Sequence, residues 1–254
     1  MNSLVIFSAL LAVSFTRITV QDSDLSPNFG YGYAVDVDRP ITVEGFACMK
    51  ESGYDVAFIR AYNASFYGSF DKNAVSNLRN ADSAGLGAEV FMTPQPNSHK
   101  SGGTQLLEVY NGLKFAGIAA NRIWVQVTSP SKWRKYYQTN VAFLTEIARA
   151  ALVQGITIGY YTNKSDWAKI TNSASAQAKY LWYWNVNGTG PSGESPADFS
   201  DFLPFGGFTM PLAKQFGKAE NICGFTVNRD VYLTNNLVKS TGRKSGEIVV
   251  GNAL

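Results

Sequence analysis

The sequence predicts a single-domain α/β protein, an irregular TIM-like barrel with about five βα units and three further strands. From residue 31 onward, short β-branched or aromatic runs alternate with segments of helical length, the pattern of βαβ units around a parallel sheet. There are eight such runs, the number that closes a barrel. The first four predicted helices each end at a glycine, namely Gly53, Gly85, Gly117 and Gly155, as a left-handed C-terminal cap favours.

The predicted strands are short and rich in the residues that suit a pleated, half-buried surface. In chain order they cover residues 31–37, 55–61, 88–93, 122–127, 156–160, 181–184, 212–216 and 222–227. Helices are predicted at 43–52, 72–84, 104–117 and 131–154, with a short one capped by Ser165. Residues 185–211 are rich in Gly, Pro and Ser without a helical period, so the later connections are expected to be loops.

The two ends of the chain are predicted to lie outside the barrel. Residues 4–15 form an apolar run, too short to span a bilayer but long enough for the core of a signal peptide. We therefore expect a cleaved signal peptide at 1–20, a barrel at 21–235 and a loose C-terminal tail at 236–254. The mature protein is expected to be secreted and extracellular, to have no membrane partner and to be a monomer.

The charge pattern limits the classes of partner. The net charge of +3 comes from scattered residues, and no Lys or Arg run suggests a phosphate-backbone track, so a nucleic-acid partner is not expected. His99 is the only histidine, which excludes a multi-histidine metal site. We expect neither a metal nor a cofactor.

If the chain is secreted, its cysteines can form a disulfide and its asparagine sequons can be glycosylated. Cys48 and Cys223 are the only cysteines, and an exported chain with an even number usually pairs them. Two buried free thiols are the alternative. Asn63, Asn163 and Asn187 each begin an N-glycosylation sequon.

Strand parity selects the side chains that would line the mouth of the barrel. On the first strand, Asp36 shares the inward face with Ala34. It is the leading acidic candidate, although it could instead cap the next helix or pair with Arg39. On the fourth strand Trp124, Gln126 and Thr128 point inward.

Gln126 and Thr128 lie two residues apart on one face of the fourth strand. Two carboxylates at this spacing would be able to divide acid and base roles across a glycosidic bond. An amide does not ionise usefully, and a threonine hydroxyl does not protonate a leaving oxygen near neutral pH. The fourth strand therefore lacks the acid that such a barrel would need to cleave sugars.

Several segments together resemble glycoside hydrolase family 25, lysozymes with an irregular barrel of five βα units and three further strands. In order they are 33–37 (YAVDV), 59–62 (IRAY), 123–125 (IWV), 158–162 (IGYYT), 181–183 (LWY), 214–216 (KQF) and 223–224 (CG). They look most like the lysozyme-like proteins of animals and amoebae, which the family associates with digestion of bacteria and innate defence. The resemblance covers nearly the whole mature chain.

The resemblance also shows which catalytic-site residues of the family are replaced in this sequence. The family cleaves peptidoglycan with an Asp-x-Glu on the fourth strand, and Gln126 and Thr128 stand at these two positions. Asn228 stands where the family commonly has an aspartate, with Asp230 nearby, and Phe91 stands where a tyrosine is usual. Of the family's acids only Asp36 remains as a residual catalytic candidate.

The side chains expected to bind a glycan are those with aromatic faces or polar groups near the mouth. They are Arg60, Tyr62, Trp124, Trp182, Trp184, Asn228 and Asp230. Instead of binding a glycan, the tryptophans could pack in the core at the ends of the barrel.

Three functional hypotheses remain open. The first is a secreted lysozyme-like protein of innate antibacterial defence that recognises bacterial peptidoglycan with weak or no muramidase activity. The second is an active lysozyme with relocated carboxylates, Asp36 acting with Asp38 or Asp230. The third is an interaction protein without a glycan ligand, for which residues 185–211 would supply the variable surface.

Overall fold

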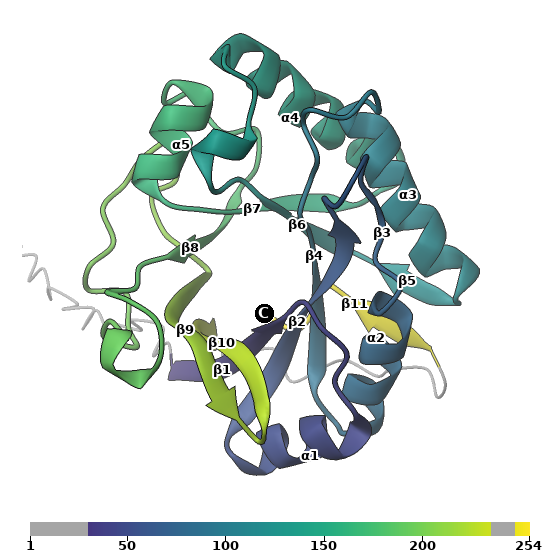
Figure 1. Ribbon diagram of the computed structural model, residues 1–254, viewed down its shortest axis with the longest axis vertical. Helices are drawn as coiled ribbons and strands as arrows, with labels where there is room; N and C mark the ends of the chain where they lie inside the picture. Colours follow the sequence, from purple (N-terminus) through teal and green to yellow (C-terminus); the bar gives the residue numbers. More distant parts are fainter. Residues whose placement is uncertain (1–29, 235–246) are drawn as a thin grey trace, which may run out of the picture.

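Eight strands close into a barrel because β1 pairs with both β2 and β10 (Figure 1). The computed structural model describes residues 30–234 and 247–254. The barrel strands are β1 (Gly30–Val37), β2 (Tyr54–Asn63), β4 (Gly87–Met92), β6 (Arg122–Gln126), β7 (Thr157–Thr162), β8 (Tyr180–Trp184), β9 (Ala213–Ile222) and β10 (Phe225–Thr234). Only β10 runs antiparallel to its neighbours around the barrel. The predicted fold class is confirmed.

The α-helices of the described residues lie on the outer side of the barrel, and none of them runs along β9 or β10 in Figure 1. They are α1 (Val43–Glu51), α2 (Ala74–Ser83), α3 (Gly102–Phe115), α4 (Tyr137–Val153) and α5 (Lys164–Thr171), with short 3₁₀ turns η1 (Pro130–Lys132) and η2 (Pro191–Gly193). The predicted helix at 131–154 starts too early, because η1 and the extended residue Trp133 precede α4. Asn163, not Ser165, caps α5 by accepting a hydrogen bond from the backbone N–H of Asp166 at 2.8 Å.

The last two strands form a long hairpin. The predicted strand at 222–227 is wrong, because Cys223 and Gly224 both have positive φ and make the turn between β9 and β10. Residues 228 and 230 therefore belong to a barrel strand. The predicted disulfide is confirmed, since Cys48 of α1 is bonded to Cys223. It ties the tip of the hairpin to the first helix.

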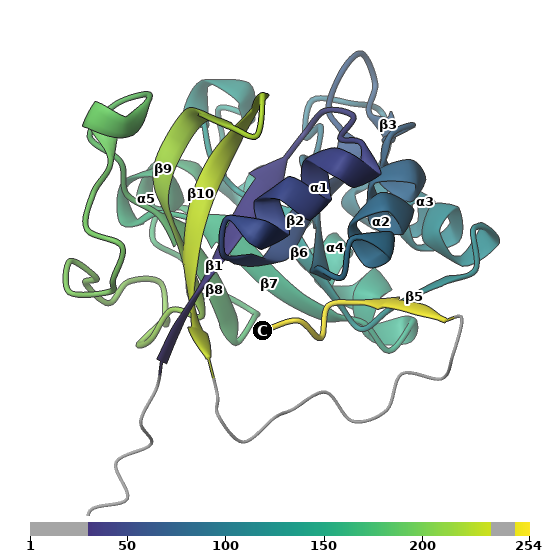
Figure 2. The same cartoon turned by 90° about the horizontal axis from the view of Figure 1, so that it is seen from below.

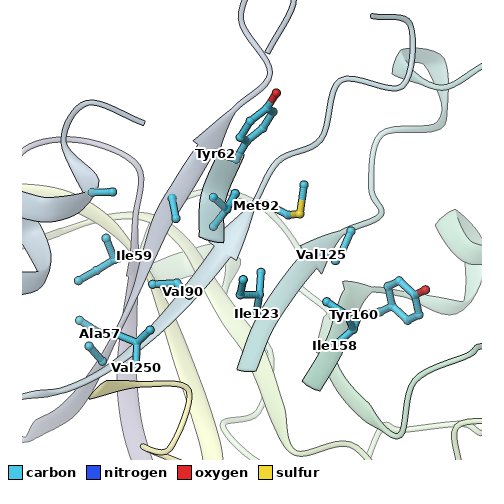
Figure 3. Close-up of a cluster of buried hydrophobic side chains, with 14 of the residues drawn as sticks. Ala57, Ile59, Tyr62, Val90, Met92, Ile123, Val125, Ile158, Tyr160 and Val250 are labelled. Atoms are coloured by element: carbon cyan, nitrogen blue, oxygen red, sulfur yellow. The ribbon is translucent and has the colours of Figure 1, made fainter. Parts of the chain in front are cut away.

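Strand parity separates two apolar layers. Val35, Val125 and their outward neighbours pack against the helices, and Figure 3 shows part of this outer layer. The inner layer fills the barrel with Ala34, Val56, Phe58, Phe91, Trp124, Tyr161, Trp182, Ala213 and Tyr232. The barrel is therefore packed through its middle, and any ligand must bind at its end.

The described C-terminal residues lie against the end of the barrel opposite the mouth (Figure 2). β11 (Ile248–Val250) pairs with β5 (Ile118–Ala120). The Gly251 N–H donates to the carbonyl of Ala88 at 3.1 Å, and the Ala253 N–H donates to Glu89 at 2.9 Å. In contrast to the loose tail expected from the sequence, residues 248–254 cover the bottom of the barrel.

The predicted signal peptide at 1–20 and residues 235–246 of the chain lie outside the described residues. Among the described residues, no helix is both long and apolar enough to cross a bilayer. Residues 185–211, expected to be a loop, are held by Lys214, whose buried ammonium group donates to the carbonyls of Pro196 and Asp198 at 2.7 and 3.0 Å.

Candidate glycan site at the barrel mouth

A pocket of about 550 Å³ opens at the carboxyl ends of β2, β4 and β6. In a parallel barrel this end collects the loops that carry function. The lining is about half polar and half apolar, with amides, hydroxyls, two cationic side chains, prolines and one indole. It consists of Arg60, Asn63, Ala64, Ser65, Thr93, Pro94, Gln95, Pro96, Asn97, Gln126, Thr128, Ser129, Lys132 and Trp133.

Gln126 and Thr128 both lie on the pocket wall. The Gln126 amide donates to the Thr128 hydroxyl at 3.0 Å and accepts from the Thr93 hydroxyl at 2.6 Å. Gln126 and Thr128, which strand parity placed on the inner face, therefore meet in the pocket. The hydrogen bond between them joins two uncharged groups. This arrangement can bind polar groups but does not supply a carboxylic acid.

The charged side chains that line the pocket are both cationic, and one of them is already paired with carboxylates. Arg60 lines the pocket, where it donates to Asp71 at 2.8 Å and to Asp38 at 3.2 Å. Lys132 is exposed on the same wall. Among the described residues that line the pocket there is no Asp or Glu. A glycosidase pocket needs two carboxyl groups at the scissile bond, so this one lacks the usual chemistry.

Asp36 and Asp230 do not line the pocket. Asp36 accepts a hydrogen bond from the Asn228 amide at 2.9 Å, and Asp230 accepts one from the Trp182 indole at 2.8 Å. The register of β1 and β10 sets Asp36 opposite Asn228 and Ala34 opposite Asp230, so the two carboxyl groups are diagonal neighbours on the inner face. In each, Oδ2 has no hydrogen-bond partner among the described residues.

Burial raises the pKa of Asp36 to about 7, with the hydrogen bond from Asn228 opposing the shift and the charge of Asp38 adding to it. Burial also raises the pKa of Asp230 well above the usual range, and the nearby Asp36 raises it further. Two like charges this close do not ionise together readily. Burial and mutual repulsion therefore both favour the protonated form of this pair.

Tyr62 does not belong to the site, contrary to the sequence prediction. The pairing of β2 with β4 shifts between Arg60 and Tyr62, so the strand bulges at Ala61. The extra residue turns Tyr62 onto the outer face, where it lies with Met92 (Figure 3). It is fully buried, and its hydroxyl donates to Glu108 of α3 at 2.9 Å.

The three tryptophans predicted to bind a glycan are core residues rather than walls of a groove. Trp124 and Trp182 are fully buried, and Trp182 stacks between Phe58 and Tyr161 at centroid distances of 4.2 and 4.1 Å. Trp184 is partly buried and packs against the same inner layer. These side chains therefore pack in the core, which was the alternative to glycan binding.

The two β10 residues predicted to bind a glycan are also engaged within the protein. Asn228 uses its amide N–H on Asp36 and accepts from the backbone N–H of Ala219 at 2.9 Å. Asp230 is fully buried. Of the seven side chains predicted to bind a glycan, only Arg60 lines the pocket.

Sequence reasoning missed the loop residues of the site. Thr93, Gln95 and Asn97 follow β4, and Lys132 and Trp133 follow β6. Their position at or soon after the ends of predicted strands was the signal that could have found them, because βα loops build the mouth of such barrels. The predicted helix start at residue 131 hid Lys132 and Trp133.

The three sequon asparagines lie in different settings. Asn63 lines the pocket, Asn163 caps α5, and Asn187 donates its amide N–H to the Glu194 carbonyl at 2.9 Å. No cluster of three or more metal-binding side chains occurs in residues 30–234 and 247–254.

Comparisons with known proteins agree with this architecture. The family model described as lysozyme-like protein 1 matches residues 27–216. The chain is 41% identical to lysozyme-like protein 7 of Caenorhabditis elegans, over 97% of this chain and 88% of that protein. It is 32% identical to probable GH family 25 lysozyme 2 of Dictyostelium discoideum, over 78% of this chain and 89% of that protein.

The fold is also similar to solved structures. A muramidase from Trichobolus zukalii superposes with a TM-score of 0.60 at 16% identity, covering 81% of this chain and 95% of that one. A family GH25 lysozyme from Aspergillus fumigatus gives a TM-score of 0.59 at 15% identity, covering 80% and 94%. With its closed barrel, its matched family model and its well-covered relatives, this chain belongs to the lysozyme-like proteins of glycoside hydrolase family 25.

Proposed function

We propose that this protein is a secreted, monomeric recognition protein of antibacterial defence. In this proposal it binds bacterial peptidoglycan in the pocket at the barrel mouth and cleaves it weakly or not at all. The observation that carries the proposal is the wall formed by Gln126 and Thr128, neutral side chains bonded to each other inside the pocket.

The pocket chemistry supports sugar binding. The lining contains the amides of Gln95, Asn97 and Gln126 and the hydroxyls of Thr93 and Ser129. The three amides also bond within the protein, so a ligand would use their remaining hydrogen-bonding capacity. N-acetylated sugars carry hydroxyl and amide groups that pair with such a lining. The exposed cation Lys132 suits the carboxylates carried by peptidoglycan stem peptides, whereas Arg60 is already paired with Asp71 and Asp38.

The same lining argues against efficient cleavage. A positioned general acid contributes about 10²- to 10⁴-fold in rate, and neither Gln126 nor Thr128 replaces one. Asp36 does not line the pocket, so it is not placed to protonate an oxygen of a sugar held there.

Paired binding and turnover assays test the proposal. The protein is incubated with insoluble peptidoglycan and pelleted, and released reducing ends are measured in parallel. We expect co-sedimentation with turnover near background. Gln126→Ala and Asn97→Ala should weaken co-sedimentation, while Leu152→Ala, a change at an exposed position on α4, should not. Pelleting no better than an unrelated barrel protein would refute glycan binding.

A second candidate is catalysis by Asp36 with Asp230. The specific observation in its favour is the pKa of Asp36, about 7, since a general acid works best with a pKa near the working pH. Asp38 is a poorer partner because it is half exposed and paired with Arg39 and Arg60. If this candidate holds, turnover should exceed background and Asp36→Asn should abolish it. Activity that survives Asp36→Asn would remove this role.

A further inference from the structure

The loop after β2 presents an aromatic side chain that folding does not explain. The Phe66 side chain is 94% exposed, and its backbone has φ of +56°. Left-handed backbone costs a bulky residue roughly 1–2 kcal/mol, and an exposed ring returns almost nothing through burial. Both features point to a role in binding rather than in stability.

The loop backbone is hydrogen-bonded to its neighbours, although the ring of Phe66 is exposed to solvent. The Gln95 amide donates to the carbonyl of Ala64 at 2.9 Å and to that of Phe66 at 3.5 Å. Lys100 donates to the carbonyl of Gly68 at 2.7 Å. Gly68 lies against Tyr62, since a Cβ at this position would be 2.8 Å from the ring. These contacts hold the backbone on both sides of Phe66.

Tyr67 extends the apolar surface. Its side chain is 65% exposed, and its ring lies 5.2 Å from the ring of His99. We call Phe66 and Tyr67 the rim aromatics. Residues 63–65, immediately before them, line the pocket, and Gln95 lines the pocket while holding the Phe66 carbonyl. The rim aromatics therefore directly follow the pocket-lining segment of this loop.

We propose that the rim aromatics form a stacking platform for a sugar ring of a glycan chain that extends out of the pocket. The inference rests on the proposed glycan binding and adds a second binding position to it. One face of a pyranose ring carries only C–H groups, which pack on an aromatic face while the hydroxyls stay in water.

The area of the rim aromatics is large enough to bind a sugar ring but too small for a stable protein interface. An aromatic side chain buries about 150–250 Å², so two rings fall short of the roughly 800 Å² that each partner buries in a stable protein interface. The neighbours Ser65 and His99 are polar, which fits an isolated platform rather than an extended apolar patch.

The test compares two ligands of different length. Binding of a GlcNAc–MurNAc disaccharide and of an eight-sugar chain of the same repeat is measured by calorimetry on full-length protein from a bacterial host, which adds no N-glycan at Asn63. We expect Phe66→Ala to lower affinity for the eight-sugar chain about tenfold and affinity for the disaccharide less than about twofold. Phe115→Ala is the matched control, because Phe115 is 90% exposed at the end of α3 and does not line the pocket.

Phe66→Gly separates binding from folding. It relieves the left-handed backbone, so its melting temperature should equal or exceed that of the wild type, while affinity for the long chain falls as with Phe66→Ala. A lower melting temperature would mean that the ring serves stability, which overturns the proposal.

The remaining outcomes are distinct. If the wild type binds neither sugar, glycan binding itself fails, and the platform fails with it. If the wild type binds both and Phe66→Ala binds the long chain equally well, only the platform is refuted. If Phe66→Ala abolishes dimer formation in sedimentation velocity without changing sugar affinity, the ring contacts a second copy and the proposal is wrong.

Discussion

Asn228 on β10 donates a hydrogen bond to Oδ1 of Asp36 on β1 at 2.9 Å, across the antiparallel pair in which these residues are register partners. The amide holds one carboxyl oxygen, while Oδ2 is buried without a partner among the described residues. The backbone N–H of Ala219 fixes Asn228 in turn. Asp36 is therefore positioned by a rigid neutral group in surroundings that disfavour its charge.

The first prediction concerns the pH dependence of stability. The pKa of Asp36 is about 7 in the folded protein, against an ordinary value of 3.8, so the folded state binds this proton more tightly. Its stabilising contribution is fully present below about pH 4 and is lost as the pH rises to 7, by up to about 1.4 kcal/mol per pH unit. Asp36→Asn should flatten this decline, measured by urea unfolding at pH 4.5, 6 and 8.

The raised pKa of Asp230 acts in the same direction, so some decline should remain in Asp36→Asn. Glu51→Gln, a change at an exposed carboxylate on α1, is the control and should leave the profile parallel to that of the wild type. Parallel profiles for Asp36→Asn as well would show that Asp36 has an ordinary pKa in the fold.

The second prediction is a gain of activity. Gln126→Asp combined with Thr128→Glu puts carboxyl groups on the pocket wall at the positions where family 25 resemblance implies them. If the pocket still holds the chain correctly, muramidase turnover should rise by about 10²-fold or more, measured as released reducing ends. The neutral double variant Gln126→Asn with Thr128→Gln should stay at background. No gain from the acidic pair would mean that the pocket no longer aligns the bond.

The third prediction concerns packing inside the barrel. A Cβ at Gly159 on β7 would lie 2.4 Å from the ring of Trp124. Gly159→Ala should therefore lower the free energy of unfolding by about 1–3 kcal/mol through overpacking. Gly103→Ala in α3, where the nearest atom would be 3.4 Å away, should be neutral or stabilising because alanine favours a helix. Equal effects of the two changes would contradict tight packing around Trp124.

The fourth prediction tests the C-terminal cover of the barrel. Gly251 has φ of +85°, and its Cβ would lie 2.2 Å from the backbone nitrogen of Arg122. Gly85 has φ of +78° and open space around it. Both alanine variants incur the left-handed backbone cost of about 1–2 kcal/mol, but only Gly251→Ala also clashes.

We expect Gly251→Ala to lower the melting temperature more than Gly85→Ala and to speed amide exchange at Ala253, whose N–H donates to Glu89. Equal melting temperatures with unchanged exchange would show that the C-terminal residues do not cover the bottom of the barrel.

The sequence predicted the fold and part of the site for a simple physical reason. Alternation along a strand fixes which side chains face inward, so the residue order alone is enough to place Asp36, Gln126 and Thr128 on the inner face. The positive φ of Gly53 and its counterparts at the ends of three further helices likewise follows from local backbone preference.

Prediction failed where the strand pattern itself is interrupted. A single bulge at Ala61 reverses the direction of Tyr62, and the tight turn at Cys223 shifts the last strand. Neither a bulge nor a turn of this kind changes composition enough to be recognised in one sequence. The packing of Trp182 between two rings also depends on which strands become neighbours.

The sequence by itself therefore determined the barrel, because strand and helix periodicity are local properties, and its resemblance to family 25 identified the fourth-strand acids that are missing. Only the tertiary structure decided that Trp124 and Trp182 fill the barrel and that loop residues after β4 and β6 form the pocket. It also decided that Asp36 and Asp230 are buried together. Burial and side-chain proximity arise from the closure of eight strands, which brings the first strand of the chain against the last strand of the barrel.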